Sequence, residues 1–465
     1  MVLRSGGRRF GWADMPHHAD TIAALATPAG TSALAVVRVS GPDTAVLARR
    51  IFGETPPPRA VRRGDYRDRT GVLVDEVLFV FFAAPHSYTG EDSLEISCHG
   101  NPFIAQKILE DVFACGVRAA GPGEFTQRAF LNGRMDLSQA EAVMDVIHAR
   151  SERALAAANQ QLRGALGRRL SELVEGLLGV LARVEAYIDF PDEDLPADDR
   201  RLVAQEIDRI ILENNRLIAT SHYGELLRDG IKTVIIGAPN VGKSSLLNRL
   251  IGRDRALVSP EPGTTRDFIE ERIVVGPHCL RLIDTAGFNP TPAPLEKLGI
   301  EKTFERAAEA DIVLLVVDAE KLSLPLPEPL KSMAGSQATI MVLNKIDLLS
   351  ADSASVPADA MQFVRVSALT GAGLSELEAE IVRMADSCHR DEDGEMIAIN
   401  ARHAQALSQA RECLAEARQK LAGKDSIELL ASDLRAALAA VGEICGRIDN
   451  ERMLDQLFAT FCIGK

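Results

Sequence analysis

The spacing of apolar residues changes several times along this chain of 465 residues. Up to about Leu131, short apolar stretches such as Ala33–Val39 and Val77–Phe82 alternate with Gly/Pro-rich turns, which predicts strands mixed with helices. From Asp136 to Ala186, leucines recur at helical spacing and form one amphipathic stripe. The first region is therefore expected to be an α/β or α+β domain, and the second a helical domain.

A second α/β pattern interrupts the helical one in the middle of the chain. After a break at Phe190–Pro196 and a further predicted helix, strand, loop and helix signals repeat from Lys232 to about Arg383, as in a doubly wound nucleotide-binding domain. Helical periodicity returns from Ala398 to Gly442. Because neither helical part can bury its stripe alone, we expect one discontinuous bundle with the α/β unit inserted; two separate helical domains are the alternative.

The expected domains are an N-terminal extension without fixed structure, an α+β domain, and a helical domain in two parts that flank the nucleotide-binding domain. In chain order they are 1–19, 20–135, 136–228, 229–384 and 385–465. The extension carries arginines but no apolar segment, so it does not predict a secretory signal. An organelle transit peptide and a start at Met15 both stay open.

Composition narrows the class of protein. With 46% hydrophobic and 25% charged residues and no apolar run near the about 20 residues of a membrane span, a soluble, non-membrane protein is expected. The formal net charge of −14 means that contact with nucleic acid would need a local basic patch or a partner. The 7 cysteines show no CxxC spacing, which favours the cytoplasm over an oxidising compartment.

A phosphate-binding motif follows the apolar stretch Thr233–Ile236. The segment Gly237-Ala-Pro-Asn-Val-Gly-Lys-Ser244 fits G-x-x-x-x-G-K-[ST] between a predicted strand and a predicted helix. Its glycines let backbone N–H groups approach phosphate oxygens, Lys243 can reach the outer phosphates, and the Ser244 hydroxyl can bind Mg²⁺. The motif and its context predict a P-loop.

Four further motifs complete the pattern of a guanine-nucleotide site. Asp284-Thr-Ala-Gly287 ends a predicted strand, where a carboxylate serves Mg²⁺ and a backbone N–H serves the terminal phosphate. Asn344-Lys-Ile-Asp347 follows another apolar run, and its aspartate can accept two hydrogen bonds from the N–H edge of guanine. Ser367-Ala-Leu369 can support the base, and Gly263-Thr-Thr-Arg266 lies between the first two motifs. This order predicts a Ras-like GTPase rather than a P-loop ATPase.

The usual catalytic glutamine is missing. Phe288 follows the Asp-x-x-Gly motif, where Ras-type enzymes carry the glutamine that orients the attacking water. Asn240 and the Ser259–Thr264 loop match the signature of GTPases that hold K⁺ against the phosphates. A monovalent cation would offset charge that develops in the transition state. K⁺ is therefore expected in place of an arginine finger.

Further segments resemble one family. DTIAALATPAG, TGEDSLEISCHG, PGEFTQRAFLNGRMDLSQAEAV, the P-loop with GTTRD and DTAG, and the terminal FCIGK occur in the order found in MnmE (TrmE) proteins, over essentially residues 20–465. The resemblance implies a multidomain α/β and α fold. Its parts are an α+β folate-binding and dimerisation domain, a discontinuous helical bundle and an inserted Ras-like P-loop G domain.

The resemblance also implies a function and an assembly. The family hydrolyses GTP in a K⁺-dependent reaction and, with the FAD-containing flavoprotein MnmG, modifies tRNA. An aminomethyl or carboxymethylaminomethyl group is added to the 5-position of the wobble uridine from a tetrahydrofolate one-carbon unit. The implied assembly is a homodimer that joins MnmG in a heterotetramer.

The family's nucleotide positions fall on identifiable residues. The residues expected to bind GTP are Asn240, Val241, Gly242, Lys243, Ser244, Ser245, Ser259, Pro260, Glu261, Pro262, Gly263, Thr264, Thr265, Asp284, Thr285, Ala286, Gly287, Asn344, Lys345, Asp347, Ser367 and Ala368. The expected Mg²⁺ ligands are Ser244 and Thr265, and the expected K⁺ ligands are Asn240, Ser259, Glu261 and Thr264. Glu296 falls on the position that orders the hydrolytic water.

The family's folate-binding positions fall on Arg38, Glu95, Arg134 and Lys465, with Arg134 replacing the usual lysine. Taken alone, Arg38 and Glu95 have a plainer interpretation as an ion pair on a strand face. Cys462 lies near the family's proposed reaction centre, where a thiolate can act on a one-carbon unit or on uridine. A buried apolar thiol at a domain junction is the alternative.

Two other functions remain open at this point. The first is a regulatory GTPase switch in ribosome or RNA assembly, although neither a KH-type domain nor a strongly basic tail is present. The second is a folate-dependent one-carbon transferase that the G domain merely regulates. Cys98 and His99 are interpreted as structural, because neighbours on a strand point to opposite faces.

Overall fold

The computed structural model describes residues 20–189, 197–253, 270–284, 307–321, 338–349, 363–387, 397–423, 426–446, 457–458 and 461–464. The chain divides into two compact units, one formed by 1–144 with 442–465 and the other by 145–441. The last 24 residues by these bounds thus group with the N-terminal part of the chain rather than with the helical bundle. Within the described ranges, no helix is long and apolar enough to cross a membrane.

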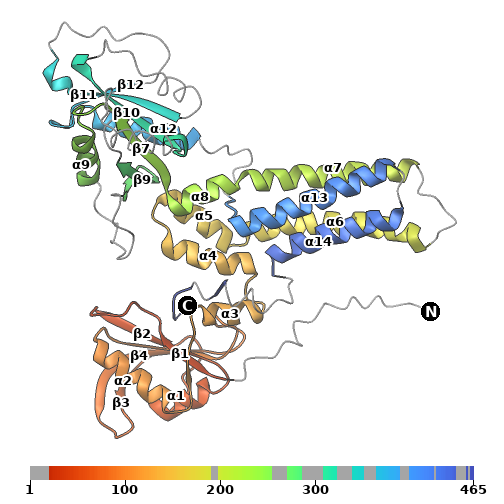
Figure 1. Cartoon of the computed structure of the whole chain (residues 1–465). Helices are drawn as coiled ribbons and strands as arrows, with labels where there is room; N and C mark the ends of the chain where they lie inside the picture. Colours follow the sequence, from red (N-terminus) through yellow and green to blue (C-terminus); the bar gives the residue numbers. More distant parts are fainter. Residues whose placement is uncertain are drawn as a thin grey trace, which may run out of the picture. The chain divides into compact units, whose positions relative to one another are not determined.

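The first unit contains a six-stranded sheet with the order β3-β4-β5-β2-β1-β6, in which only the β1 and β6 pair is parallel. The strands are β1 (Ile22–Leu25), β2 (Leu34–Ser40), β3 (Val61–Arg67), β4 (Leu73–Phe82), β5 (Ser93–His99) and β6 (Arg118–Ala119). Helices α1 (Thr44–Phe52) and α2 (Pro102–Phe113) share one core with the sheet (Figure 1). The short helix α3 (Glu124–Leu131) follows β6.

Alternation along β2 and β5 decides which side chains reach that core. Val37 and Val39 are fully buried with Leu94 and Ile96, because successive residues of a strand point to opposite faces. The residues between them, Arg38 among them, therefore lie on the other face of the sheet. Cys98 is likewise buried whereas its neighbour His99 is exposed and pairs with Asp75; burial raises the pKa of the Cys98 thiol.

The second unit contains a helical bundle drawn from both ends of its sequence. Its helices are α5 (Glu152–Leu162), α6 (Ala165–Asp189), α7 (Ala197–Ala219), α8 (Ser221–Asp229), α13 (Ala401–Gly423) and α14 (Ile427–Ile444), preceded by α4 (Leu137–His148). Helix α13 packs along α7, and Asn214 Nδ2 donates to the Leu407 carbonyl oxygen at 2.9 Å (Figure 1). The prediction of one discontinuous bundle with an inserted domain is confirmed.

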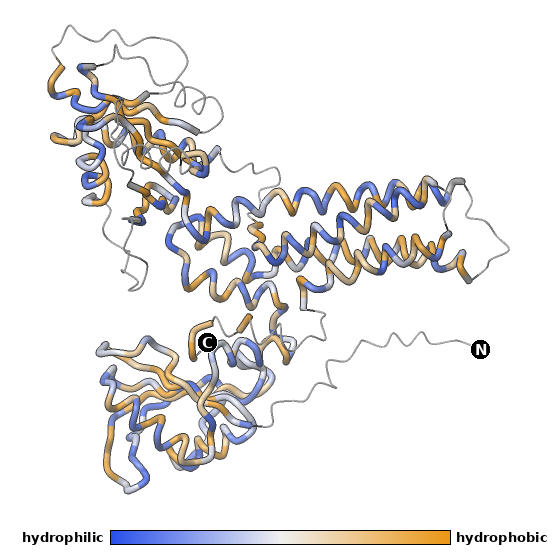
Figure 2. The backbone as a smooth tube through the Cα atoms, viewed as in Figure 1, coloured by the Kyte–Doolittle hydropathy of each residue, from blue (hydrophilic) through white to orange (hydrophobic). Residues whose placement is uncertain are grey.

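The buried stripe predicted for the long helices is also present. Leu166, Leu170, Leu173 and Leu177 of α6 are all buried, and the tube of Figure 2 alternates between hydrophobic and hydrophilic colours along these helices. Ion pairs join the solvent faces, among them Arg418 with Asp208 at 2.9 Å.

The inserted G domain is a mostly parallel sheet with the order β12-β11-β10-β7-β9-β8, in which β8 alone runs antiparallel to its neighbour. Its strands are β7 (Ile231–Gly237), β8 (Glu270–Val275), β9 (His278–Asp284), β10 (Ile312–Asp318), β11 (Ala338–Asn344) and β12 (Phe363–Val366). Helices α9 (Lys243–Arg253) and α12 (Leu374–Ser387) pack against this sheet. The predicted motifs therefore follow the carboxyl ends of parallel strands, where doubly wound sheets bind ligands.

Candidate functional site

The predicted P-loop joins β7 to α9. Gly242 has φ 94° and lies so close to the neighbouring loop that an added Cβ would sit 2.3 Å from the Asn344 Nδ2 atom. Asn240 has φ 61°, a left-handed conformation that asparagine tolerates better than most residues. Only glycine at 242 allows this approach, so the loop is held in a compact curve at the start of α9.

Lys243 occupies the first position of α9 and is mostly buried. Its Nζ donates to the carbonyl oxygens of Gly237 at 3.2 Å and Ala238 at 3.0 Å. The ammonium group thus lies over the loop, and Ser244 and Ser245 follow it, exposed, in the first turn of the helix. Backbone N–H groups and a cation at a helix N-terminus suit a phosphate.

Asn344 joins the P-loop to the base-supporting loop. It is 2% exposed, donates through Nδ2 to the Val241 carbonyl oxygen at 2.8 Å, and accepts through Oδ1 from the Ala368 N–H at 2.9 Å. A single amide side chain therefore fixes three predicted nucleotide-binding segments relative to one another.

Asp347 is exposed beside Asn344, and its Oδ1 accepts a hydrogen bond from the buried hydroxyl of Ser367. Lys345 has φ 68° and its Nζ lies 2.8 Å from Asp318 Oδ2. Asp318 was not among the predicted residues, although it ends the apolar run of β10 just as Asn344 ends that of β11.

Part of the predicted nucleotide site is not described. The backbone of Asp284 ends β9 beside Ile235 of β7, one strand from the P-loop. The following predicted residues lie outside the described ranges: Ser259, Pro260, Glu261, Pro262, Gly263, Thr264, Thr265, Thr285, Ala286, Gly287, Glu296 and Lys465.

The first unit brings Arg38 and Glu95 together on the face of the sheet opposite α1 and α2. The two residues are direct partners across β2 and β5, and Arg38 Nε donates to Glu95 Oε1 at 2.9 Å. The ion pair of the plainer interpretation is therefore present. The Arg38 guanidinium carbon also lies 5.6 Å from the centre of the Tyr88 ring and 5.7 Å from that of Phe125.

The end of the chain reaches the same place. Arg38 Nη1 donates to the Gly464 carbonyl oxygen at 3.1 Å, Gly123 N–H donates to the Cys462 carbonyl oxygen at 3.2 Å, and Ile463 bridges to Pro122. Cys462 is exposed, which excludes its interpretation as a buried apolar thiol. The C-terminal segment thus lies beside Arg38.

Arg134 belongs to the same neighbourhood. It is exposed, and its side chain packs over Gly90, in the loop that also carries Tyr88. Tyr88 and Phe125 were not predicted as site residues. Aromatic side chains have many uses, so only their contact with Arg38 identifies them.

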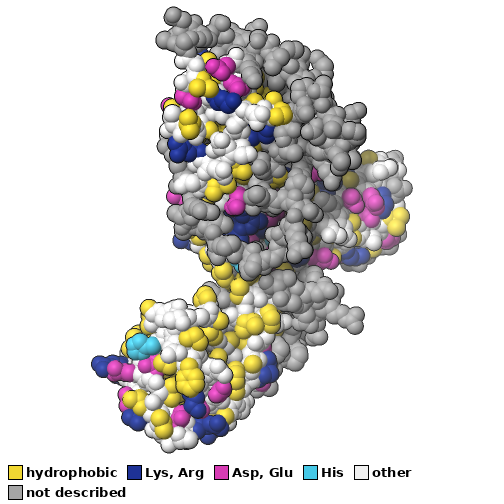
Figure 3. Space-filling view, turned by 60° about the vertical axis from the view of Figure 1, so that its left-hand side comes forward, with side chains coloured by type: hydrophobic (Ala, Val, Ile, Leu, Met, Phe, Trp, Pro, Cys, Tyr) yellow, Lys and Arg dark blue, Asp and Glu magenta, His cyan; other side chains and the backbone are white. Residues whose placement is uncertain are grey.

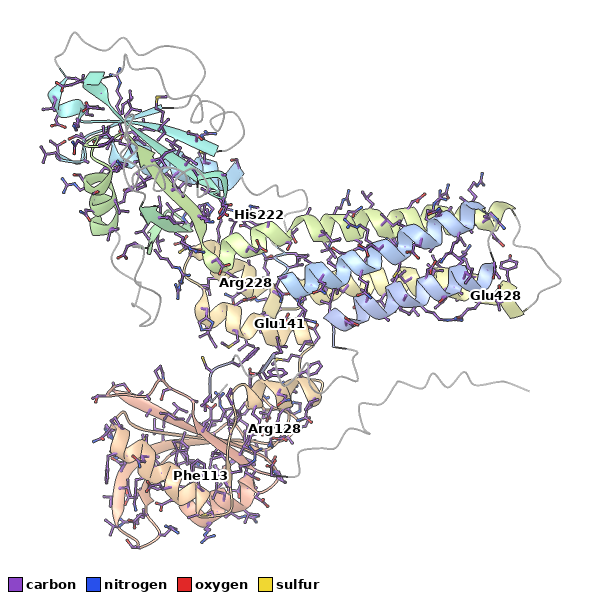
Figure 4. All side chains as sticks on the ribbon, viewed as in Figure 1. Phe113, Arg128, Glu141, His222, Arg228 and Glu428 are labelled. Atoms are coloured by element: carbon purple, nitrogen blue, oxygen red, sulfur yellow. The ribbon has the colours of Figure 1, made fainter. Side chains whose placement is uncertain are left out.

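A cluster of charged residues is buried next to this region. Arg128 is 1% exposed and pairs with Asp20, Glu91 and Glu124 (Figure 4). The hydrogen bond from Arg118 is the main reason that the pKa of Asp20 is lowered. Burial acts to raise the pKa of Glu124, but hydrogen bonds from Arg118, Gly121 and Arg128 outweigh it and lower that pKa.

A Ras-like domain inserted into a helical bundle, after an α+β domain with a cationic site, defines a multidomain GTPase. Family profiles described as "GTP-binding protein TrmE N-terminus" and "MnmE helical domain" match residues 21–134 and 137–462. The tRNA modification GTPase MnmE of Opitutus terrae is 61% identical over 452 residues, which cover 97% of this chain and 100% of the relative. That of Akkermansia muciniphila is 44% identical, with 96% and 99% covered.

The chain belongs to the MnmE family of tRNA modification GTPases, and it is a GTP-hydrolysing enzyme. Among solved structures, the G domain of the T. maritima FeoB iron transporter is 28% identical, with a TM-score of 0.25, and the match covers 33% of this chain and 98% of that domain.

Proposed function

We propose that this chain couples K⁺-stimulated GTP hydrolysis to modification of the wobble uridine of tRNA. In this proposal an MnmG-type flavoprotein is its partner, and a tetrahydrofolate one-carbon unit provides the carbon that is added to the 5-position of the base. The proposal is carried by two contacts of Arg38, which donates hydrogen bonds to the Glu95 carboxylate and to the Gly464 carbonyl oxygen. Glu95 and Gly464 come from distant parts of the chain.

The residues beside Arg38 fit a reduced folate. Such a molecule has a ring with an N–H edge, whose hydrogen bonds the Glu95 carboxylate can accept. It also has an anionic tail, which suits the cationic side chains of Arg38, Arg134 and Lys465. The Tyr88 and Phe125 rings offer apolar surface for the flat part of the ligand. When bound, the folate supplies the one-carbon unit. The exposed Cys462 of the C-terminal segment can act as a nucleophile in its thiolate form.

The G domain is proposed to hold Mg²⁺ through the hydroxyls of Ser244 and Thr265, since Mg²⁺ prefers oxygen ligands. K⁺ is assigned to Asn240, Ser259, Glu261 and Thr264; the exposed amide of Asn240, at the top of the P-loop, suits a cation beside the phosphates. Hydrolysis should be faster in KCl than in NaCl at matched ionic strength, and equal rates would contradict the assignment. Glu296→Ala should lower turnover with little effect on nucleotide affinity, as a water-orienting group predicts.

A homodimer and a heterotetramer with the flavoprotein are the proposed assemblies, in the cytoplasm. Large hydrophobic side chains such as Leu34, Leu78 and Phe103 are exposed on the first unit, and hydrophobic side chains gather on the face of that unit seen in Figure 3. An apolar surface of this kind supports a dimer interface there.

The proposal can be tested in a bacterial strain that lacks its own enzyme of this family. Wild-type chain should restore the modified wobble nucleoside, measured by mass spectrometry of digested tRNA, whereas Lys243→Ala and Glu95→Gln should not. Glu76→Gln is a matched control, because Glu76 forms an Arg–Glu pair with Arg63 across β3 and β4 of the same sheet. If Glu95→Gln restored the nucleoside, the proposed one-carbon site would be wrong. If the wild-type chain failed to restore it, a regulatory GTPase would be favoured.

A further inference from the structure

The β8 and β9 strands form a two-stranded ribbon at one edge of the G-domain sheet. β9 runs parallel to β7, so that Leu280 pairs with Ile231 at the beginning of β7 and Asp284 pairs with Ile235 near its end. The GTTRD motif precedes β8 in the sequence and the DTAG motif begins at the end of β9. One end of the ribbon therefore carries two nucleotide motifs, and the hairpin at the other end lies about 20 Å away.

The hairpin end is joined to helix α5 of the bundle through one carboxylate and one backbone hydrogen bond. Asp386 Oδ1, near the end of α12, accepts from Arg153 Nη2 at 2.6 Å and from His278 Nε2 at 2.9 Å. The Arg153 backbone N–H also donates to the Pro277 carbonyl oxygen in the hairpin at 3.2 Å. We call Asp386, Arg153 and His278 the Asp386 latch; it joins α5, the hairpin and α12.

Within the latch His278 is buried, whereas the side chain of Asp386 is 43% exposed. His278 is 3% exposed, and burial lowers the pKa of its imidazole even though Asp386 acts in the opposite direction. The ring is therefore neutral at physiological pH, and the proton on Nε2 is the one donated to Asp386. A hydrogen bond between a buried ring and a carboxylate holds the hairpin in one position.

A cavity lies on the other side of helix α5. A cavity of about 190 Å³ lies among α4, α5 and α8, and much of its wall consists of small side chains: Ala149, Ala154, Ala157, Ala158 and Ala398. Arg228 of α8, labelled in Figure 4, lines it and forms a two-point ion pair with Asp145. The cavity is partly open to solvent, and α5 and α8 share one buried core that contains Ala154, Leu226 and Leu227.

We propose that the β8–β9 ribbon transmits the nucleotide state to the helical bundle, with Asp386 as the positioning residue that fastens the ribbon to α5. The inference rests on the GTPase activity of the chain and on no assumption about folate or tRNA. A ribbon with continuous cross-strand pairing from Glu270 to Val275 cannot absorb a displacement at its nucleotide end internally. The displacement reaches the latch, and the latch passes it to α5.

Hydrogen exchange on the full-length chain tests the proposal. Wild type and Asp386→Ala would be compared with GDP and with a non-hydrolysable GTP analogue, each with Mg²⁺ and KCl, and the affinity for each nucleotide would be measured separately. In wild type the exchange rates of α5 amides should differ between the nucleotides by at least about fivefold, the low end of ordinary allosteric coupling. In Asp386→Ala that difference should vanish from α5 and persist in β8 and β9.

Three further variants keep the test decisive. Asp208→Ala removes a comparable Asp–Arg pair inside the bundle and should leave the response of α5 unchanged. If Asp386→Ala does not fold, Arg153→Gln removes only the α5 half of the latch and should give the same loss, which Arg153→Lys should partly restore. An α5 response that survives in these latch variants, or is missing from nucleotide-bound wild type, would overturn the proposal and leave the latch a purely structural contact.

Discussion

The nucleotide site and the Arg38 site are assembled in opposite ways. In the first, Asn344 joins loops that all follow strands of one sheet within the G domain. In the second, Arg38 near the beginning of the chain bonds to Gly464 at its end, across 426 positions. A site of the first kind depends on local loop geometry, whereas one of the second kind exists only if the whole chain folds back correctly. Damage at the C-terminus should therefore separate the two activities.

Deleting Cys462–Lys465 should have the largest effect. The deletion removes the Gly464 carbonyl that holds Arg38 and the Cys462 carbonyl that holds Gly123. Wobble-uridine modification in cells should be abolished, whereas K⁺-stimulated GTP hydrolysis by the purified protein should stay near the wild-type rate. A truncated protein that still modifies tRNA would show that this segment carries no essential chemistry.

The converse experiment changes Asp347, the carboxylate that is predicted to recognise guanine. Asp347→Asn should weaken GTP binding at least about tenfold, which corresponds to ~1.4 kcal/mol, because hydrogen bonds to a charged group contribute more than neutral ones. Titration with a fluorescent GTP analogue measures this, and binding of folate to the same variant is the control. Unchanged GTP affinity would exclude Asp347 as the guanine reader.

A pair of glycines sharpens the comparison further. Gly464 and Gly116 have nearly equal φ values, 93° and 94°, but an added Cβ at 464 would lie 2.3 Å from the Leu25 carbonyl oxygen, whereas at 116 it meets nothing within 4 Å. Alanine at either position should cost about 1–2 kcal/mol of backbone strain.

Only Gly464→Ala should also displace the terminal segment and slow modification, by about fivefold or more, the factor that corresponds to ~1 kcal/mol. Nucleoside analysis of tRNA from complemented cells compares the two variants. Equal effects from both would mean that strain, not the position of the segment, is what matters.

Acid should act weakly, and on the first unit. The lowered pKa values of Asp20 and Glu124 mean that these carboxylates contribute stability above their unfolded-state pKa and lose it as pH falls through the lower folded-state pKa. Below about pH 4 the free energy of unfolding should decline, and Asp20, whose side chain is 45% exposed, should contribute no more than about 1 kcal/mol to that decline. Urea unfolding followed by circular dichroism should show a shallower decline in Arg118→Ala; an identical slope would contradict this origin.

The same contrast explains what sequence could predict. The fold class followed from periodicity, and the nucleotide loops followed from motifs, because each motif is a short segment at a strand end. Arg38 and Glu95 were identified through family resemblance, since no local pattern places the two side by side. Tyr88, Phe125 and Arg128 were missed, as was the contact between Arg153 and Asp386, which lie 233 positions apart. Such contacts depend on how distant segments pack, and no spacing within a segment encodes them.

If the two ends of the chain build one folate site, folate binding should need the C-terminal segment whereas GTP binding should not. Calorimetric titration of the full-length protein and of the chain lacking Cys462–Lys465 with a tetrahydrofolate derivative tests it most directly. We expect one folate-binding site per full-length chain, and folate binding at least about tenfold weaker in the truncated chain. The affinity for GTP should be equal in both proteins. Equal folate affinity in the two proteins, or none in the full-length chain, would contradict it.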